Sequence, residues 1–258
     1  MRRDYPERRS EAWDVADFGD ERVVVLADFM KKRKKLPKGL EASPHMTHLQ
    51  VPRHLADQLR ESHVRNLLGD LELRGEGTCD LSRMGLAKGI TSVGGYKCIP
   101  MFEPASFPAL RLLSTWQKNK TRLFTLIDAL PKLRSLFVPA HPELLLHLPP
   151  RLGFLQVLWG ALESLAGASR LSELEWLMID RVAKLRSLDG LEGHPTLKKI
   201  DLTHCPLVTD VTPLTSCPSL RYVSINYCKA LAGSPKSPSL VALAKLLASR
   251  GGALEVES

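Results

Sequence analysis

The chain has 258 residues, 44% of them hydrophobic, and its 36 basic and 28 acidic residues give a formal net charge of +8. This length and composition suffice to bury a large core, as one large or two smaller domains. No segment approaches the run of about 18 apolar residues that a membrane-spanning helix needs. The charges at the N-terminus are not followed by an apolar stretch, so no secretory signal is indicated and we predict a cytoplasmic protein.

Residues 1–22 are mostly charged and predict a polar N-terminal leader or cap. From residue 23 to residue 230, an apolar frame of the form L-x-x-L-x-L recurs ten times, with Ile, Val or Met at some of the Leu positions. The first, fourth and fifth units depart from it at the third position, which holds Asp28, Gly95 and Thr115. The ten units begin at Val23, Met46, Leu68, Ile90, Leu110, Leu133, Leu152, Leu174, Leu197 and Leu220. Their spacings of 23, 22, 22, 20, 23, 19, 22, 23 and 23 residues are too regular for chance matching of apolar residues.

The alternation inside each unit predicts a short strand with one face turned inward. A single strand of this kind cannot bury its apolar face, whereas stacked copies form a parallel sheet with a continuous core. The segments between strands are long enough for one or two helical or 3-10 turns, and the short step from Leu133 to Leu152 predicts an extended return. Residues 231–258 predict a loop and then an apolar helix, closed by Gly251 and Gly252, that caps the last unit.

The two clearest units, Pro195–Cys205 and Pro218–Cys228, share the frame P-x-L-x-x-L-x-L-x-x-C. This frame resembles the leucine-rich repeat family, in the form with short units of 19–23 residues and Cys or Asn after the strand. The resemblance implies an α/β fold: a right-handed solenoid with a curved parallel sheet on its concave face. Short helical, 3-10 or extended returns would form the convex face. It also implies that Cys98, Cys205 and Cys228 point inward and meet backbone groups of the turn.

The sequence shows no pattern typical of catalysis or of metal binding. It lacks G-x-G-x-x-G, the P-loop motif, G-x-S-x-G and H-E-x-x-H, and its cysteines have no C-x-x-C spacing. His204 and Cys205 are adjacent, but neighbouring residues of a strand point to opposite faces. We therefore predict a protein that is not an enzyme, with no catalytic residues, no cofactor and no metal.

In the repeat type that the sequence resembles, the residues between the buried apolar positions face the concave surface. There the chain places six aromatic residues, where a solvated strand face is normally polar. Large exposed apolar patches mark binding surfaces, and Trp and Tyr dominate the binding energy at interfaces. The residues predicted to bind a protein partner are Tyr96, Trp116, Phe137, Phe154, Gln156, Leu158, Trp176, Met178, Asp180, Asp201 and Tyr222.

Charged residues are expected at the two margins of this surface, as the polar rim of an interface. One margin would hold Asp70 and Glu72, and the other Asp180, Lys199 and Asp201. The alternative is that the face assignment is wrong by one residue, or that a loop covers the patch. In either case the aromatic residues would belong to the core.

These features predict a non-catalytic protein-binding module, either a bacterial immunity-type protein that neutralises a toxin or an adaptor. The alternative function is association with nucleic acid or ribonucleoprotein through two basic loops, Lys31–Lys35 and Gln117–Arg122. That alternative predicts an affinity that falls steeply with salt concentration. No membrane partner is expected.

Overall fold

The computed structural model describes residues 14–18, 21–25, 34–36, 40, 46–95, 97–232 and 237–257. The chain has a mixed α/β fold built on parallel strands, and it divides into two compact units, Met1–Trp116 and Gln117–Ser258. In the described ranges, every helix is too short or too polar to cross a membrane.

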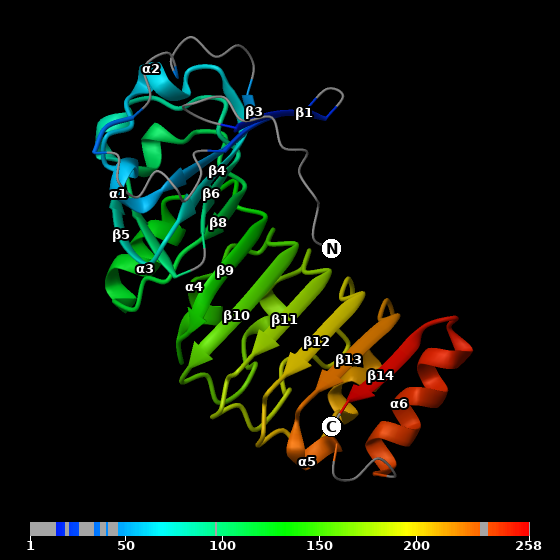
Figure 1. The fold of residues 1–258 in the computed structure, drawn as a ribbon. Helices are drawn as coiled ribbons and strands as arrows, with labels where there is room; N and C mark the ends of the chain where they lie inside the picture. Colours follow the sequence, from blue (N-terminus) through cyan, green and yellow to red (C-terminus); the bar gives the residue numbers. More distant parts are fainter. Residues whose placement is uncertain are drawn as a thin grey trace. The chain divides into compact units, whose positions relative to one another are not determined.

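The first unit contains a sheet with the strand order β1-β2-β3-β4-β6-β8 and a second sheet made of β5 and β7 (Figure 1). The strands are β1 (Asp14–Phe18), β2 (Glu21–Val25), β3 (Met46–Pro52), β4 (Leu67–Arg74), β5 (Gly77–Asp80), β6 (Ser92–Gly94), β7 (Cys98–Met101) and β8 (Leu112–Ser114). The helical segments are α1 (Arg53–Ala56), α2 (Glu61–Val64), η3 (Ser82–Met84) and η4 (Pro104–Ser106). All neighbouring strands of this unit are parallel except β1 and β2, which form an antiparallel pair. Strand β1 lies in the region predicted as a polar cap, and β2 runs from that region into the first predicted repeat unit.

The third unit of the repeat differs from its prediction by one residue. Leu67 is fully buried, whereas Leu68, predicted as the first buried position, is 60% exposed. The cause is an irregularity in the pairing of β3 with β4: Met46 pairs with Leu67 and His48 with Asp70. Two residues of β4 therefore lie opposite one residue of β3, which turns Leu68 outward.

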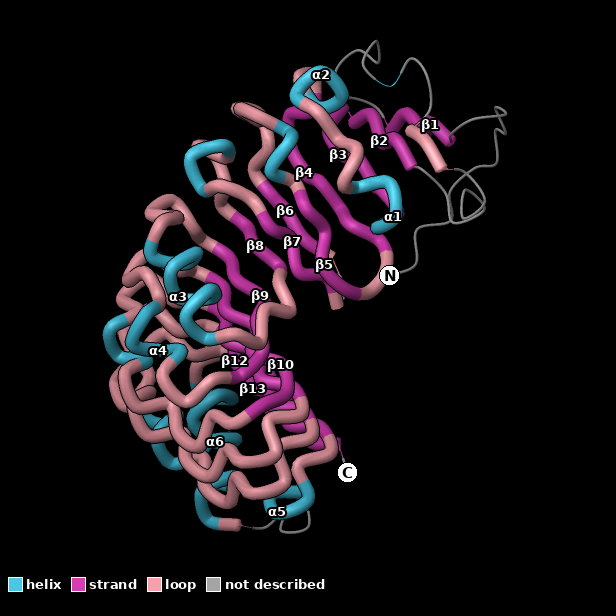
Figure 2. Tube along the Cα trace, turned by 90° about the vertical axis from the view of Figure 1, so that its left-hand side faces the viewer, coloured by secondary structure: helices cyan, strands magenta, loops and turns pink. Residues whose placement is uncertain are grey.

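The second unit contains six parallel strands in the order β9-β10-β11-β12-β13-β14, side by side in Figure 1. The strands are β9 (Ser135–Ala140), β10 (Phe154–Gly160), β11 (Trp176–Asp180), β12 (Lys199–Thr203), β13 (Tyr222–Asn226) and β14 (Ala253–Glu257). The helical segments are α3 (Lys120–Asp128), α4 (Leu144–His147), η5 (Ala168–Arg170), η6 (Thr212–Ser216), α5 (Lys229–Ala232) and α6 (Pro238–Ser249). Figure 2 shows α3, α4 and the loop returns of this unit on one side of its strands.

The core of the second unit consists of the apolar frame positions, stacked in register. Leu155 pairs with Leu136 on one side and with Leu177 on the other, and the same row continues through Ile200 and Val223. Each of these side chains is at most 1% exposed. The predicted alternation, and with it the inward face of each strand, is confirmed for this unit.

Two returns differ from the sequence predictions. The short step after β9 contains a helical turn, α4, where we expected an extended chain, and this turn buries Leu144 and Leu145 in the core. The second predicted basic loop is partly helical: Asn119 caps α3, and its side chain accepts a hydrogen bond from the Arg122 N–H at 3.0 Å.

The C-terminal helix is confirmed, and an additional strand follows it. Helix α6 begins after Ser237, whose hydroxyl accepts a hydrogen bond from the Leu240 N–H, and it buries Leu240, Leu243 and Leu247. Strand β14 then pairs in parallel with β13. This strand was not predicted, although the alternation of Leu254 and Val256 is its signal in the sequence.

The packing predicts a large and a small loss of stability for two neighbouring substitutions in β11. Leu177→Ala removes a buried side chain from the middle of the stacked row and should lower the free energy of unfolding by about 2–5 kcal/mol. Met178→Ala, on the partly exposed side of the same strand, should cost less than about 1 kcal/mol. Urea unfolding monitored by circular dichroism would measure both values, and equal costs would contradict the assignment of the two faces.

Candidate binding face of the second unit

The outward side chains of β9–β14 form three rows across the sheet, because the strands pair in register. The first row is Ser135, Phe154, Trp176, Lys199, Tyr222 and Ala253. The second row is Phe137, Gln156, Met178, Asp201, Ser224 and Glu255. The third row is Pro139, Leu158, Asp180, Thr203, Asn226 and Glu257. We call these three rows the binding face.

The binding face includes every predicted partner-binding residue of the second unit. Most of its side chains are partly exposed, whereas the residues that alternate with them along β9–β13 are buried. A face assignment wrong by one residue is therefore excluded for these strands, and the aromatic residues are not part of the core.

Three aromatic rings lie next to one another on neighbouring strands. The ring centroids of Phe137 and Phe154 are 5.0 Å apart, and those of Phe154 and Trp176 are 4.8 Å apart in an edge-to-face arrangement. Pairs with this geometry contribute about 0.5–1.5 kcal/mol beyond the area that they bury. This aromatic cluster is therefore ordered without a partner and offers a rigid apolar surface.

A lysine extends the aromatic cluster along the first row. The ammonium group of Lys199 lies 4.3 Å from the ring centroid of Trp176 and 4.6 Å from that of Tyr222. It also lies 3.4 Å from a carboxylate oxygen of Asp201. The face thus holds a cation between two aromatic rings and a carboxylate, an arrangement that cation–π attraction and charge pairing both favour.

Asp201 was predicted to lie on a charged margin of the face, but it lies within the face. It is only 8% exposed, and it accepts a hydrogen bond of 2.5 Å from the indole Nε1 of Trp176. Lys199 and Asp201 therefore lie within the face, with β13 and β14 beyond them, because the sheet continues past the last predicted strand. The hydrogen bond fixes the orientation of the Trp176 ring.

Strand β14 adds two exposed carboxylates to the face. Tyr222 donates a hydrogen bond from its hydroxyl to Glu255, and this interaction raises the pKa of the phenol above its ordinary value. Tyr227 donates in the same way to Glu257, with a distance of 3.3 Å. Both glutamates were missed because β14 itself was not predicted.

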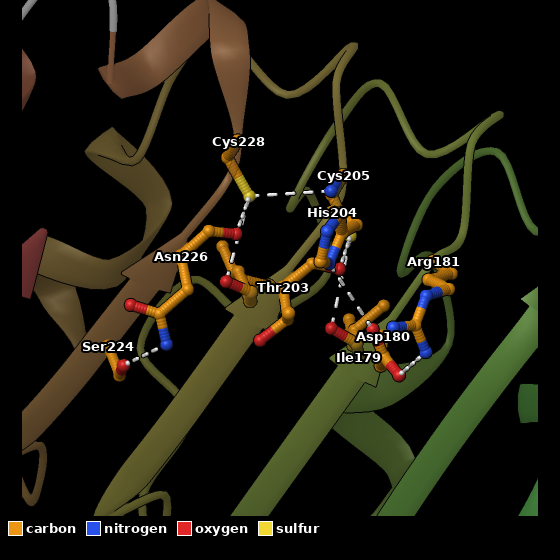
Figure 3. A network of polar contacts seen from close by, with 10 residues as sticks. Ile179, Asp180, Arg181, Thr203, His204, Cys205, Ser224, Asn226 and Cys228 are labelled. Atoms are coloured by element: carbon orange, nitrogen blue, oxygen red, sulfur yellow. Dashed lines mark hydrogen bonds and ion pairs between the residues drawn. The ribbon is translucent and has the colours of Figure 1, made fainter. Parts of the chain in front are cut away.

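A second set of functional candidates lies at the ends of the strands; Figure 3 shows two of them, Arg181 and His204. Arg181, His204 and Tyr227 directly follow β11, β12 and β13, and Trp159 is the last residue but one of β10. Each of the four has a positive φ between 39° and 56°. The backbone N–H groups of the first three donate to the carbonyls of Thr203, Asn226 and Glu257 on the next strand, at 2.8–2.9 Å. These bonds offset the cost, about 1–2 kcal/mol, of the left-handed conformation.

The side chains of these residues form an edge row beside the binding face. Arg181 lies 5.6 Å from the ring centroid of Trp159 and pairs with Asp180 at 3.0 Å. The rings of His204 and Tyr227 stack with centroids 4.9 Å apart. These residues can be located in the sequence by their position in each unit. Each one comes directly after the last outward strand residue and one residue before the position that holds cysteine in the last two units.

The cysteines of the last two units are buried and contact the backbone, as the sequence predicts. The Cys205 N–H points to the sulfur of Cys228 at 3.4 Å, and the Cys228 thiol lies 3.6 Å from the Leu202 carbonyl (Figure 3). The neighbouring Cys228 thiol and burial raise the pKa of Cys205. His204, by contrast, is exposed, so the adjacent Cys205 and His204 do not form a reactive pair.

Cys98 is also buried, but in a different setting. It lies at the start of β7, and its sulfur is 3.3 Å from the sulfur of Cys79 in β5. The small β5-β7 sheet replaces a simple turn after β4 and β6, so the thiol that Cys98 contacts comes from the neighbouring strand of that sheet.

Two predicted aromatic residues of the patch belong to the first unit. Tyr96 lies outside the described residues. Trp116 lies two residues after the end of β8 and is partly exposed, and its backbone N–H donates to the Cys98 carbonyl at 2.8 Å. Of the six aromatic residues predicted to form one patch, the binding face of the second unit contains Phe137, Phe154, Trp176 and Tyr222.

In the first unit, the outward side of β3 and β4 is polar. Nε2 of His48 lies 3.1 Å from Glu72, and Nδ1 of His48 lies 3.6 Å from Asp70. The side chains of Asp70 and Glu72 raise the pKa of His48 to about 9. Glu72 is also held by Gln50 at 2.7 Å and by Arg74 at 2.8 Å. We call this group the His48 cluster.

Comparisons with known proteins do not assign the chain to a family. A scan against protein-family models finds no match, and a search of curated proteins finds none either. The function is therefore inferred from the geometry of the chain itself.

The His48 cluster predicts a pH dependence of stability. The pKa of His48 is raised in the folded chain from its ordinary value of 6.5 to about 9, so the folded state binds the proton more tightly. The stabilisation is fully present below pH 6.5 and is lost as the pH rises through about 9.

Urea unfolding between pH 6 and pH 10 would measure this effect as the difference between the wild-type chain and His48→Gln. The difference should be largest at the acidic end of this range and should shrink toward zero above pH 9. His54→Gln, at an exposed histidine of the same unit, serves as the control. A difference that stays constant with pH would contradict the proposed charge state of His48.

Proposed function

We propose that the chain is a right-handed leucine-rich repeat solenoid and that its function is to bind a protein partner on the binding face, without catalysis. Three features of the second unit support this proposal. The apolar frame positions stack in register, the returns lie on the other side of the strands, and Cys205 and Cys228 contact backbone groups as the repeat requires.

The observation that supports a binding function most directly is the aromatic cluster. Phe137, Phe154 and Trp176 stay partly exposed on a sheet whose other side is buried along β9–β13. Exposed apolar surface is costly in water unless a partner covers it, and rigid aromatic residues bind without a large loss of side-chain entropy. The cluster has the composition and the order of an interface anchor.

Two roles are compatible with such a face. An immunity-type protein would form a tight one-to-one complex with a toxin and block its active site. An adaptor would hold its partner without changing the partner's activity. An activity assay of the captured partner, with and without the chain, distinguishes these roles.

The rival proposal, nucleic-acid binding, concerns the basic segments. Of the run Lys31–Lys35, only Lys34 and Lys35 are among the described residues, and the Lys34 carbonyl accepts a hydrogen bond from Gln58 at 2.7 Å. In the second segment, Lys120 pairs with Glu143 at 3.4 Å. The pair with Glu143 directs the positive charge of Lys120 toward the chain's own group, and the binding face favours the protein-binding proposal.

Substitutions in the aromatic cluster should abolish binding and leave the fold intact. Trp176→Ala and Phe154→Ala should each weaken the complex by about 2 kcal/mol or more, roughly 30-fold in affinity. Phe154→Ala is needed beside Trp176→Ala because Trp176 also binds Asp201. Leu146→Ala, at a 55% exposed leucine of α4 on the returns, is the matched control.

The measurement is quantitative affinity capture with the full chain as bait, followed by hydrogen exchange of the purified complex. The proposal expects protection of β9–β13, and loss of the same partner with both aromatic variants but not with the control. A partner retained by both aromatic variants, or one released by nuclease treatment or moderate salt, would contradict the proposal.

A further inference from the structure

The charge on the binding face has the opposite sign to that of the whole chain. On β11–β14 the face has four carboxylates, from Asp180, Asp201, Glu255 and Glu257, against the single ammonium of Lys199, a net charge of −3 by count. The complete chain has a net charge of +8. A local negative field on a basic protein attracts a positively charged partner and repels nucleic acid.

Two of these carboxylates have no cationic partner in the described part of the chain. Glu255 and Glu257 accept hydrogen bonds from Tyr222 and Tyr227, whereas the nearby Lys199 and Arg181 pair with Asp201 and Asp180. Both glutamates are exposed, and they lie two residues apart on the outward side of β14. Each therefore has acceptor capacity for an incoming cation.

Asp180 has one paired and one unpaired oxygen at the same end of the sheet. Its Oδ2 pairs with Arg181, whereas its Oδ1 is buried with no hydrogen-bond partner among the described residues. Nδ1 of His204 lies 3.8 Å from Oδ1, beyond hydrogen-bonding distance (Figure 3). The acceptor capacity that is open to an incoming cation is therefore that of Glu255 and Glu257.

Lys199 shows which chemistry the face accommodates. Its ammonium group is held by the rings of Trp176 and Tyr222 and by a carboxylate. Tyr227 with Glu257 repeats this combination of an aromatic ring and a carboxylate, with no cation paired to Glu257 among the described residues. Glu255 lies beside Tyr222, whose ring already contacts Lys199, and likewise has no ion-pair partner in the described part of the chain.

We propose that the partner of this face is a protein segment that presents Arg or Lys side chains beside a large apolar side chain. The apolar side chain would cover Phe137, Phe154 and Trp176, and the cations would bind at Glu255 and Glu257. This inference depends on the proposed function, because it describes the partner of the same binding face. The guanidinium or ammonium group gains charge-assisted hydrogen bonds and cation–π contacts there.

The test uses a library of random peptides displayed on phage, each about 12 residues long, which in extended form is enough to cross the face. Selection on the wild-type chain should enrich peptides that combine Arg or Lys with an aromatic or large aliphatic residue. Trp176→Ala identifies the peptides that bind the face.

The binding of the enriched peptides is then measured with the double variant Glu255→Gln/Glu257→Gln. These substitutions keep an acceptor for each tyrosine and remove only the charge. Affinity should fall at least about tenfold, because hydrogen bonds to charged groups are stronger than neutral ones. The matched control, Glu163→Gln/Asp189→Asn, neutralises two exposed carboxylates on the returns and should leave affinity unchanged.

The outcomes separate the inference from the proposed function. Peptides that depend on Trp176 but are neutral or acidic, or that bind the double glutamine variant equally well, overturn the inference and leave the function standing. A selection that yields no peptide sensitive to Trp176→Ala overturns both. A fluorescent single-stranded RNA that binds the chain, and binds more tightly after neutralisation of Glu255 and Glu257, would assign the face to nucleic acid and also overturn the inference.

Discussion

The structure of the second unit depends on one constraint: apolar residues 22 or 23 positions apart must lie in register on neighbouring strands. The row through Leu155, Leu177, Ile200 and Val223 satisfies it, and every member is at most 1% exposed. Burial of each such side chain contributes about 1.5–3 kcal/mol, and a slip of one residue would expose the whole row. The register is therefore fixed by the core.

The outward surface follows from the same register. Because side chains alternate along a strand, fixing the inward rows also fixes the outward rows. The rings of Phe154 and Trp176 meet because Leu155 and Leu177 are paired beneath them, and Lys199 reaches both Trp176 and Tyr222 for the same reason. The arrangement of this face is thus a consequence of how the core packs.

The sequence predicts this unit well because its signal is local and repeated. Strand positions, inward residues, outward aromatic residues and the buried Cys205 and Cys228 all follow from an alternation that recurs at a near-constant step. Helix α6 follows from its own apolar spacing. The prediction fails where a single departure from the frame decides the structure: the irregular pairing at Leu68, the helical turn α4, and the small sheet that places Cys98 beside Cys79.

The site was predictable only in part, because contacts between strands depend on more than the repeat. That Trp176 and Met178 face outward follows from the pattern. Three other features do not follow from it: the hydrogen bond from Trp176 to Asp201, the left-handed residues at the strand ends, and the glutamates of β14. Each of them depends on the position of a neighbouring strand. The pKa of His48 has the same origin, because Asp70 and Glu72 lie on the adjacent strand.

Site-specific photo-crosslinking tests the central claim most directly. A benzophenone amino acid placed at position 178, on the binding face, would be irradiated in the presence of cell extract. The same probe at position 207, an exposed leucine on a return, provides the comparison. The account predicts one discrete crosslinked protein from position 178 and none from position 207. Equal crosslinking from both positions, or a discrete product from position 207 alone, would contradict it.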